Sequence, residues 1–279
     1  MLFKSIAYIS AYTHVVCNAM SDSTNFEPLS QTSFYVETFK SGKSIAKGTC
    51  FFVVRNDKTF LITNWHIVTG QNPKNKDYLG FYAVSPDRLV VKIYKNQDIL
   101  ELVDFEVRLT DTTENKLWLE HPTEKENIDV VAIPVEIPND KLIFSPETFI
   151  EPFNEETNVL VGKDVFILGY PFGINGDNIF PIWKRGSIAS EPIVNIDGLP
   201  KLYVDTATRP GMSGSPVIYM EKRQVGIGDA PPGTLGAKFS NRLMQIVGVY
   251  SGRIGADDEL AAQLGIVWKF DIINELTNQ

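Results

Sequence analysis

Short β-rich runs separated by turn residues constrain the fold of this chain more than any other feature. In the first half, β-branched and aromatic residues gather near 33–39, 44–55, 58–64, 89–94, 100–109 and 130–135. In the second half they gather near 163–168, 184–190, 201–205, 215–220, 244–250 and 264–270. Runs of this length with turn signals between them predict β-strands. We expect an all-β protein that ends in a short helix from about Asp271.

The two groups of six runs suit two antiparallel β-barrels. Asn56-Asp57 predicts a hairpin turn within the first group, and a stretch rich in Pro, Glu and Asn from 137 to 158 separates the groups. The expected organisation is an N-terminal extension (1–30), a first barrel (31–140), a connection (141–160) and a second barrel with the C-terminal helix (161–279).

Composition excludes several kinds of partner. The chain has 279 residues, of which 43% are hydrophobic, enough to bury a large core. Its formal net charge of −8 argues against nucleic acid or an anionic membrane surface as a partner. After residue 20 no apolar segment reaches about 18 residues, so we expect no membrane span there. The oligomeric state stays open.

Residues 209–217 read Arg-Pro-Gly-Met-Ser-Gly-Ser-Pro-Val. Small residues on either side of Ser213 let the backbone turn sharply and let a substrate carbonyl approach the hydroxyl. The N–H groups of Gly211 and Ser213 can point at one spot, as an oxyanion site requires. A Gly-x-Ser-Gly segment is common in turns, so its meaning depends on what lies upstream.

A serine nucleophile needs a base, usually a histidine that a carboxylate orients. The chain has three histidines, and His66 is the one that closes an apolar strand-like segment. Asp129 stands directly ahead of another apolar run, so its carboxylate enters a hydrophobic interior and needs a partner there. The His66 imidazole is the natural partner. Of the other two histidines, His121 is expected in a solvated loop, and His14 falls in the N-terminal extension.

These motifs resemble those of the trypsin-like (chymotrypsin-fold) serine peptidases, of the compact bacterial type. Residues 63–68, 129–132 and 211–216 resemble the family's Thr-Ala-Ala-His, Asp-(Ile/Val)-Ala-Leu and Gly-Asp-Ser-Gly-Gly-Pro motifs in the same order. Residues 48–53, 169–171 and 248–252 add supporting matches, and the resemblance runs from about 31 to about 275.

The resemblance implies a serine endopeptidase that cleaves protein or peptide substrates, with the active site in the crevice between the barrels. His66, Asp129 and Ser213 would form the catalytic triad, and the N–H groups of Gly211 and Ser213 the oxyanion hole. No cofactor is expected.

The order of the motifs excludes other hydrolases. An α/β-hydrolase has its histidine after the nucleophile, whereas no histidine follows Ser213. A papain-like peptidase needs a cysteine well ahead of the histidine at a helix start, but Cys50 lies in a strand-like run and is interpreted as a small core residue. The histidines and cysteines show no metal-ligand spacing, so no metal site is expected.

Three departures from the family pattern matter. Met212 stands where animal digestive members have an aspartate that pairs with a new N-terminus, so we expect activity without N-terminal processing. Ser215 replaces a glycine, and we expect it to be tolerated. Cys17 and Cys50 are poor candidates for a disulfide, so the core is expected to hold without cross-links.

Substrate specificity is only weakly indicated. By family register Ala207 lies at the floor of the side-chain pocket, which leaves no carboxylate there for Arg or Lys. Ser251 and Gly252 belong to the segment that would line the cleft, and Arg209 and Arg253 flank it. The two arginines suit either an acidic substrate or a solvated surface. Residues 221–242 form a long predicted connection that could gate the cleft or bind a partner.

Two questions stay open at this point. Residues 1–19 loosely resemble a signal peptide, but polar residues interrupt the apolar stretch and Met20 is a plausible start. We expect a cytoplasmic protein, with export through a weak signal as the alternative. The alternatives to a turnover enzyme are a catalytically silent binding module on the same fold and a peptidase that cleaves itself once.

Overall fold

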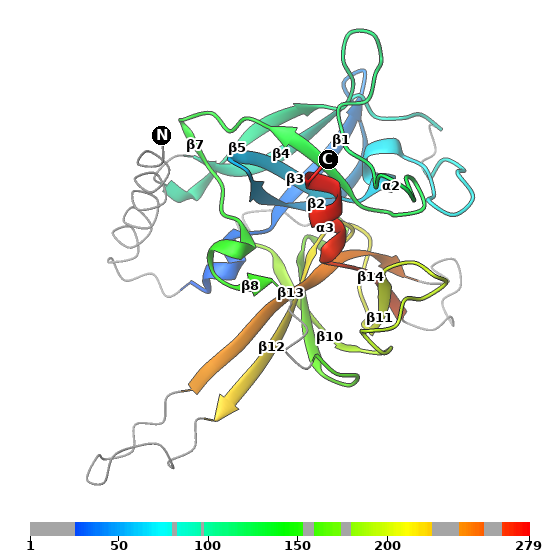
Figure 1. Cartoon of the computed structure of the whole chain (residues 1–279). Helices are drawn as coiled ribbons and strands as arrows, with labels where there is room; N and C mark the ends of the chain where they lie inside the picture. Colours follow the sequence, from blue (N-terminus) through cyan, green and yellow to red (C-terminus); the bar gives the residue numbers. More distant parts are fainter. Residues whose placement is uncertain are drawn as a thin grey trace.

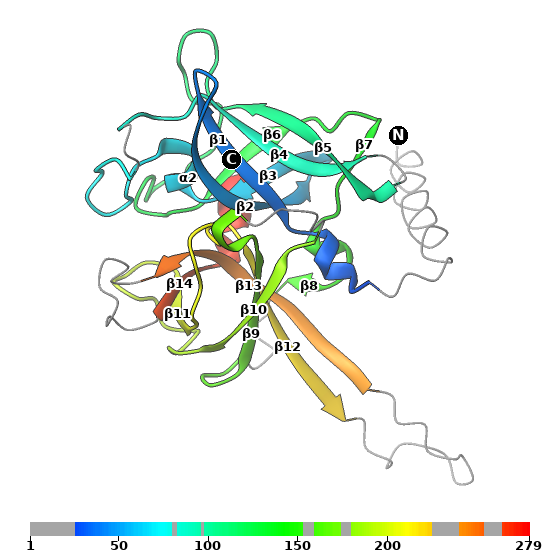
Figure 2. The same ribbon diagram turned by 180° about the vertical axis from the view of Figure 1, so that it is seen from behind.

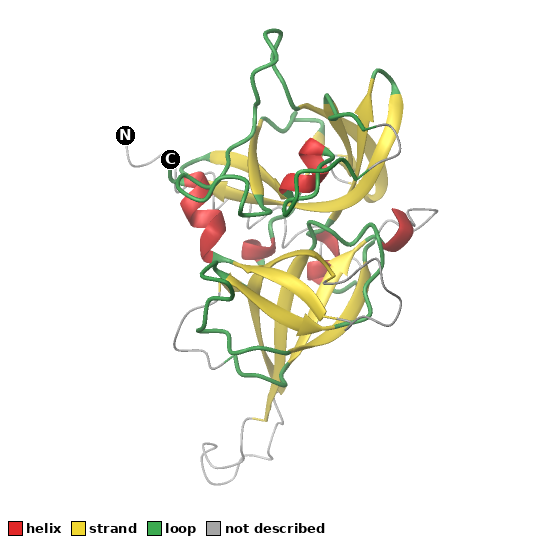
Figure 3. Cartoon of the chain, turned by 90° about the vertical axis from the view of Figure 1, so that its right-hand side faces the viewer, coloured by secondary structure: helices red, strands yellow, loops and turns green. Residues whose placement is uncertain are grey.

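The computed structural model describes residues 26–79, 83–95, 98–152, 159–173, 180–224, 240–253 and 264–279. Two β-bodies are stacked on one another (Figure 3). The C-terminal helix α3 (Asp271–Thr277) lies at the side where they meet (Figure 1). Residues 1–25 lie outside the described residues, and they include the signal-like segment, His14 and Cys17.

The first body is an antiparallel sheet in the order β5-β4-β1-β2-β3-β6. Its strands are β1 (Phe34–Lys40), β2 (Lys43–Arg55), β3 (Lys58–Thr63), β4 (Arg88–Lys95), β5 (Asp98–Arg108) and β6 (Val131–Val135). The predicted turn at Asn56-Asp57 joins β2 to β3, with both residues at positive φ (50° and 62°) and Arg55 paired with Lys58. Asn and Asp tolerate this conformation better than most residues, which explains the tight hairpin.

The second body closes completely into a barrel. Its six strands are β9 (Asp164–Gly169), β10 (Ile182–Ile188), β11 (Lys201–Asp205), β12 (Pro216–Gln224), β13 (Ser240–Arg253) and β14 (Leu264–Lys269). They follow the order β12-β9-β10-β11-β14-β13, and the pairing of β12 with β13 closes the ring. The predicted fold class, two six-stranded antiparallel barrels with a short C-terminal helix, is confirmed, and the first of them stays open between its edge strands β5 and β6.

The predicted connection between the barrels contains structure of its own. Strand β7 (Lys141–Leu142) pairs with β4 of the first sheet. After the 3-10 turn η2 (Pro146–Thr148), β8 (Glu151–Pro152) pairs in parallel with β13 of the second. Each sheet therefore has a seventh, two-residue strand, and the connection contacts both barrels.

The predicted connection at 221–242 was too long. Strands β12 and β13 stay paired from Pro216↔Val249 to Gln224↔Ser240, so only 225–239 lie outside the described residues. The paired ends project from the second barrel as a two-stranded ribbon (Figures 1 and 2). The charged residues there weakened the strand signal, but antiparallel pairing supplies hydrogen bonds to the backbone whatever the side chains are.

A shared apolar cluster joins the barrels and α3. Phe51 and Phe60 from the first barrel, Ile218 from the second and Ile273 from α3 belong to it, and all are buried. At its edge Arg55 of β2 forms two hydrogen bonds with the Glu147 carboxylate (2.7 and 2.8 Å) and also contacts Asn274 of α3. The barrels therefore pack through a continuous core.

His121 does not lie in a solvated loop as predicted. It is 6% exposed, its Nδ1 accepts a hydrogen bond from the Glu124 N–H (3.1 Å), and its Nε2 lies 2.6 Å from a Glu275 oxygen on α3. Helix α3 returns to the first barrel and covers it. This long-range contact has no local sequence signal.

Cys50 is a core residue, as predicted. It is a free, fully buried cysteine in β2, and burial raises the pKa of its thiol. A thiol that stays protonated is a poor nucleophile. Among the described residues, none of the helices has both the length and the apolar character needed to cross a bilayer.

The α3 anchor can be tested with two isoleucines. Ile273→Ala should lower the free energy of unfolding by about 2–5 kcal/mol, because it opens a cavity in the shared core. Ile193→Ala, at an isoleucine that is 88% exposed, should change it by less than about 0.5 kcal/mol. Urea unfolding measures both, and equal effects would contradict the assigned role of α3.

Candidate active site

His66 and Asp129 form a close pair in the first barrel. The Nδ1 atom of His66 lies 2.7 Å from Oδ2 of Asp129, and the backbone N–H of His66 donates to Oδ1 (2.8 Å). Because Nδ1 faces the carboxylate, the Nε2 atom is the one left for other chemistry. Nε2 has no hydrogen-bond partner among the described residues.

Helix α2 (Trp65–Thr69) fixes the position of the imidazole. This single turn follows strand β3 directly and stops at Gly70, which adopts the left-handed conformation (φ 71°) and donates to the His66 carbonyl. The Trp65 indole N–H donates to Glu120 (3.1 Å), which holds the start of the helix. The ring of His66 therefore sits on a segment with little freedom to shift.

The Asp129 carboxylate is almost completely buried, at 1% exposed. Besides the two contacts from His66, it accepts a hydrogen bond from the hydroxyl of Ser251 on β13, and the Asn64 side chain donates to its backbone carbonyl (2.6 Å). A buried carboxylate is tolerable only when such partners satisfy it. Since Ser251 comes from the second barrel, this carboxylate joins the two halves of the site.

Ser213 lies in a tight turn ahead of β12, between two glycines with positive φ. Gly211 (φ 96°) and Gly214 (φ 87°) both adopt a conformation that favours glycine. A Cβ at Gly211 would overlap the Tyr170 carbonyl, and one at Gly214 would overlap the Thr49 carbonyl. Both glycines are required by close backbone contact as well as by conformation.

Two backbone N–H groups beside Ser213 are unpaired. Within the part of the chain that the structure describes, neither Gly211 N–H nor Ser213 N–H has an acceptor, whereas Met212, Gly214 and Ser215 all donate. The Ser213 hydroxyl donates to the Ser251 carbonyl (3.0 Å), not to His66. The structure thus links His66 and Asp129 to Ser213 through Ser251, whose hydroxyl contacts the Asp129 carboxylate and whose carbonyl accepts from the Ser213 hydroxyl.

Thr49 of β2 ties the serine turn to the first barrel. Its N–H donates to the Ser213 carbonyl (2.8 Å), and its hydroxyl donates to the Gly211 carbonyl (2.8 Å). The same hydroxyl accepts from the Tyr170 N–H (3.2 Å). Thr49 therefore fixes the position of the Ser213 turn relative to the first barrel, which also carries His66. Sequence reasoning noted the segment around Thr49 but missed its role, because no local pattern signals a contact of this kind.

Ser215 and Met212 fit the core around this turn. Ser215 is fully buried opposite Gly169, where any side chain at 169 would overlap the Ser215 hydroxyl. The serine is accommodated because its neighbour is a glycine. Met212 is also buried and packs in the apolar cluster of the second barrel.

The predicted cleft residues separate into two groups. Ser251 and Gly252 lie near the end of β13, where the Ser251 carbonyl contacts Ser213, and Ala207 is half-buried on the segment that leads to Ser213. Arg209 is exposed, and its guanidinium donates to the Thr208 carbonyl (3.2 Å). The backbone of Arg253 pairs with Gly265, and its side chain lies outside the described residues.

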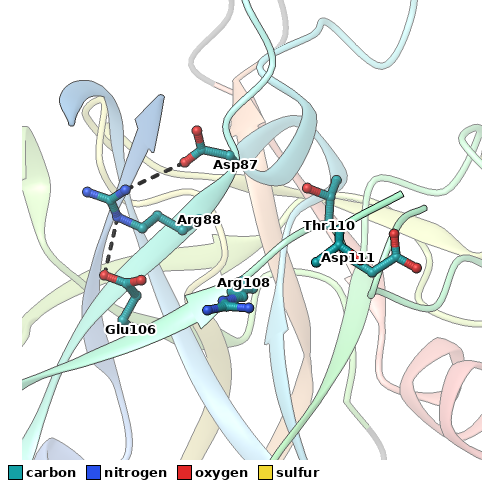
Figure 4. Close-up of a pocket in the computed structure, with 7 residues that line it drawn as sticks. Asp87, Arg88, Glu106, Arg108, Thr110 and Asp111 are labelled. Atoms are coloured by element: carbon teal, nitrogen blue, oxygen red, sulfur yellow. Dashed lines mark ion pairs between the residues drawn. The ribbon is translucent and has the colours of Figure 1, made fainter. Parts of the chain in front are cut away.

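The cavities of the first barrel lie away from this site. One, of about 240 Å³, is lined by charged residues of β4 and β5, where Arg88 pairs with Asp87 and Glu106 (Figure 4). Another, of about 380 Å³, lies where the edge strands β5 and β6 stay unpaired. Among the described residues no group of three or more His, Cys, Asp and Glu side chains is placed to hold a metal.

Two barrels that share one cluster of histidine, aspartate and serine place the chain in the double-barrel class of peptidases. The model of the trypsin-like peptidase domain matches residues 48–227, which is more than half of the sequence. This chain therefore belongs to the trypsin-like peptidase family.

Solved structures of proteases are similar to this chain at low sequence identity. A serine endoprotease from Yersinia pestis is 12% identical with a TM-score of 0.49, and the alignment covers 89% of this chain and 62% of that one. Rv3671c from M. tuberculosis H37Rv, in an inactive form, is 17% identical with a TM-score of 0.44, covering 89% and 86%. This chain thus spans less than two thirds of the Yersinia protein. No curated protein sequence matches it significantly.

The contact between Gly214 and Thr49 predicts a large effect of one methyl group. Gly214→Ala should lower the free energy of unfolding by at least about 3 kcal/mol, because it adds both conformational strain and a clash. Gly198→Ala is the matched control, since φ is similar (73°) but no atom lies within 4 Å of the new Cβ. That variant should lose only about 1 kcal/mol. Similar losses in urea unfolding would refute the close contact.

Proposed function

We propose that the protein is a serine endopeptidase that uses Ser213 as nucleophile, His66 as general base and acid, and Asp129 as the carboxylate that orients the histidine. The observation that carries this proposal is the His66–Asp129 pair (2.7 Å), buried beside a serine whose own N–H and that of Gly211 are both unpaired. Peptide-bond hydrolysis needs these groups together: a base, a nucleophile and two donors for the oxyanion. The substrate is a protein or peptide.

The reaction proceeds in two halves. The Ser213 oxygen bonds to the scissile carbonyl carbon while its proton passes to His66 Nε2, and the carbonyl oxygen takes up negative charge between the N–H groups of Gly211 and Ser213. The C–N bond then breaks, and the leaving amine takes the proton from His66. Water attacks the acyl-enzyme with His66 again as base, which releases the carboxylic acid and restores the serine hydroxyl.

The serine hydroxyl must turn before it reacts. In the structure it donates to the Ser251 carbonyl, so a rotation about its Cα–Cβ bond has to bring it towards His66 Nε2. Such rotations between staggered positions are rapid, and hydrogen bonds in unliganded sites often tighten only when substrate binds. Asp129 supports the proton transfer because its negative charge stabilises the imidazolium that forms.

Removing single groups should separate catalysis from folding. Ser213→Ala should abolish peptide hydrolysis, and Asp129→Asn should lower kcat by about 10³–10⁴-fold, because the amide favours the wrong histidine tautomer. The control is Asp197→Asn, at an exposed aspartate that pairs with Lys201, which should keep full activity. Hydrolysis of an unfolded protein substrate is the measurement. Unchanged rates in Ser213→Ala would sink the proposal.

A second prediction concerns activation. Met212 is buried in an apolar cluster and cannot pair with an ammonium group, so activity should not depend on a newly released N-terminus. We expect the intact chain to hydrolyse substrate without prior cleavage, with intact mass recorded before and after the assay. Activity that appears only after a cut near residue 30 would contradict this.

The Ser213–Ser251 hydrogen bond also favours a second candidate function, a catalytically silent binding module. In such a protein the hydroxyl would keep its contact with the Ser251 carbonyl when a peptide binds. Peptide binding by the wild type without any hydrolysis, and equal affinity in Ser213→Ala, would support this alternative over the peptidase.

A further inference from the structure

Three backbone segments come together near Ser213. They are the end of β13 at Ser251–Arg253, the segment from Thr206 to Thr208 that follows β11, and the start of β14 at Leu264 and Gly265. Pairing brings them together, because Arg253 lies opposite Gly265, and Gly265 in turn lies opposite Val204 at the end of β11. Gly265 carries no side chain, so the space between the segments is available to whatever projects into it.

The side chain of Tyr250 lies between these segments, at the Thr208 and Gly265 side of the apolar cluster of the second barrel. It is 1% exposed, and its hydroxyl is hydrogen-bonded to the hydroxyl of Thr208, which is buried as well. Its ring lies against Gly265: a Cβ there would be 2.5 Å from the Tyr250 ring atom Cε2 and 3.2 Å from its hydroxyl oxygen. The ring therefore spans from β13 across to the other two segments.

Tyr250 is also fixed at its backbone. The N–H of Gly214 donates to the Tyr250 carbonyl (2.8 Å), and the N–H of Tyr250 donates to the Ser215 carbonyl (2.9 Å). The residue is thus tied to the serine turn on both sides. Its backbone therefore has a fixed position, and its ring cannot swing out without breaking the contact with Thr208.

A substrate side chain has to enter the same region. When the scissile carbon bonds to Ser213 and its oxygen lies at the N–H groups of Gly211 and Ser213, the residue that supplies that carbonyl (P1) is one bond further on. Because the Ser213 hydroxyl contacts the Ser251 carbonyl, this residue lies beside Ser251. The family register that puts Ala207 at the pocket floor directs its side chain between β13 and the segment ending at Thr208, where the Tyr250 ring already lies.

We propose that Tyr250, held by Thr208, closes the side-chain pocket and restricts the P1 residue to small side chains such as Ala, Val and Ser. The inference rests on the proposed peptidase function. Aromatic and long aliphatic P1 side chains would collide with the ring, and overpacking of this kind is costly. Arg and Lys would meet a buried, already bonded hydroxyl instead of a carboxylate, so their charge would lose water without gaining a partner.

The test is the cleavage preference of wild type, Tyr250→Val and Tyr250→Phe on a peptide library randomised at every position. Mass spectrometry identifies the residue before each cut, corrected for its abundance. In the wild type, cleavage after Ala or Val should be at least about 100-fold more frequent than cleavage after Phe. Tyr250→Val opens the pocket and should raise the frequency of cleavage after Leu and Phe, relative to Ala, at least about 10-fold. Tyr250→Phe keeps the ring and should keep the wild-type ranking.

The outcomes separate this inference from the proposed function. A wild type that cuts after Phe, Arg or Lys as readily as after Ala overturns the inference, and it does so whether or not Tyr250→Val folds. A folded Tyr250→Val variant with an unchanged ranking overturns it too. The acyl-enzyme burst with p-nitrophenyl acetate, which has no P1 side chain, reports on the nucleophile independently of the pocket when it is compared with Ser213→Ala. Its absence in the wild type overturns the proposed function and the inference with it.

Discussion

The buried carboxylate of Asp129 is the interaction on which the site depends. An isolated charge at 1% exposure would be strongly destabilising, so every group around it is arranged to donate to it. His66 donates from the backbone and faces it with Nδ1, and Ser251 donates from the other barrel. The same contacts orient the imidazole, connect the two barrels and leave Nε2 without a hydrogen-bond partner among the described residues. The contacts that satisfy the buried charge are therefore also the contacts that orient His66.

Close backbone contact between the barrels is the second feature on which the position of the serine turn depends. The serine turn approaches β2 so closely that Gly214 has no room for a side chain, and Thr49 holds two carbonyls of that turn. In the same turn the N–H groups of Gly211 and Ser213 have no acceptor among the described residues, which leaves them available to an oxyanion. An apolar core continuous with α3 then keeps the two barrels in register.

Much of this could be predicted from the sequence, because the relevant signals are local. The β-rich runs predict where the strands lie. A serine between glycines and an aspartate ahead of an apolar run can each be recognised as a candidate site residue from the neighbouring residues alone. What the sequence missed depends on distant contacts. His121 is buried only because α3 folds back over it, the ribbon of β12 and β13 extends through charged residues, and Tyr250 looks like any strand aromatic until Thr208 and Gly265 are placed around it.

The most direct test is labelling of the intact protein with a small fluorophosphonate, followed by mapping of the adduct. This probe reacts with a serine only when the base and oxyanion donors are assembled around it, so it reports on the site without assuming any substrate. We predict one adduct per chain, on Ser213, that is absent from both Ser213→Ala and His66→Ala. A folded protein that takes up no label, or carries it on another residue, would contradict the assignment of these residues as a working triad.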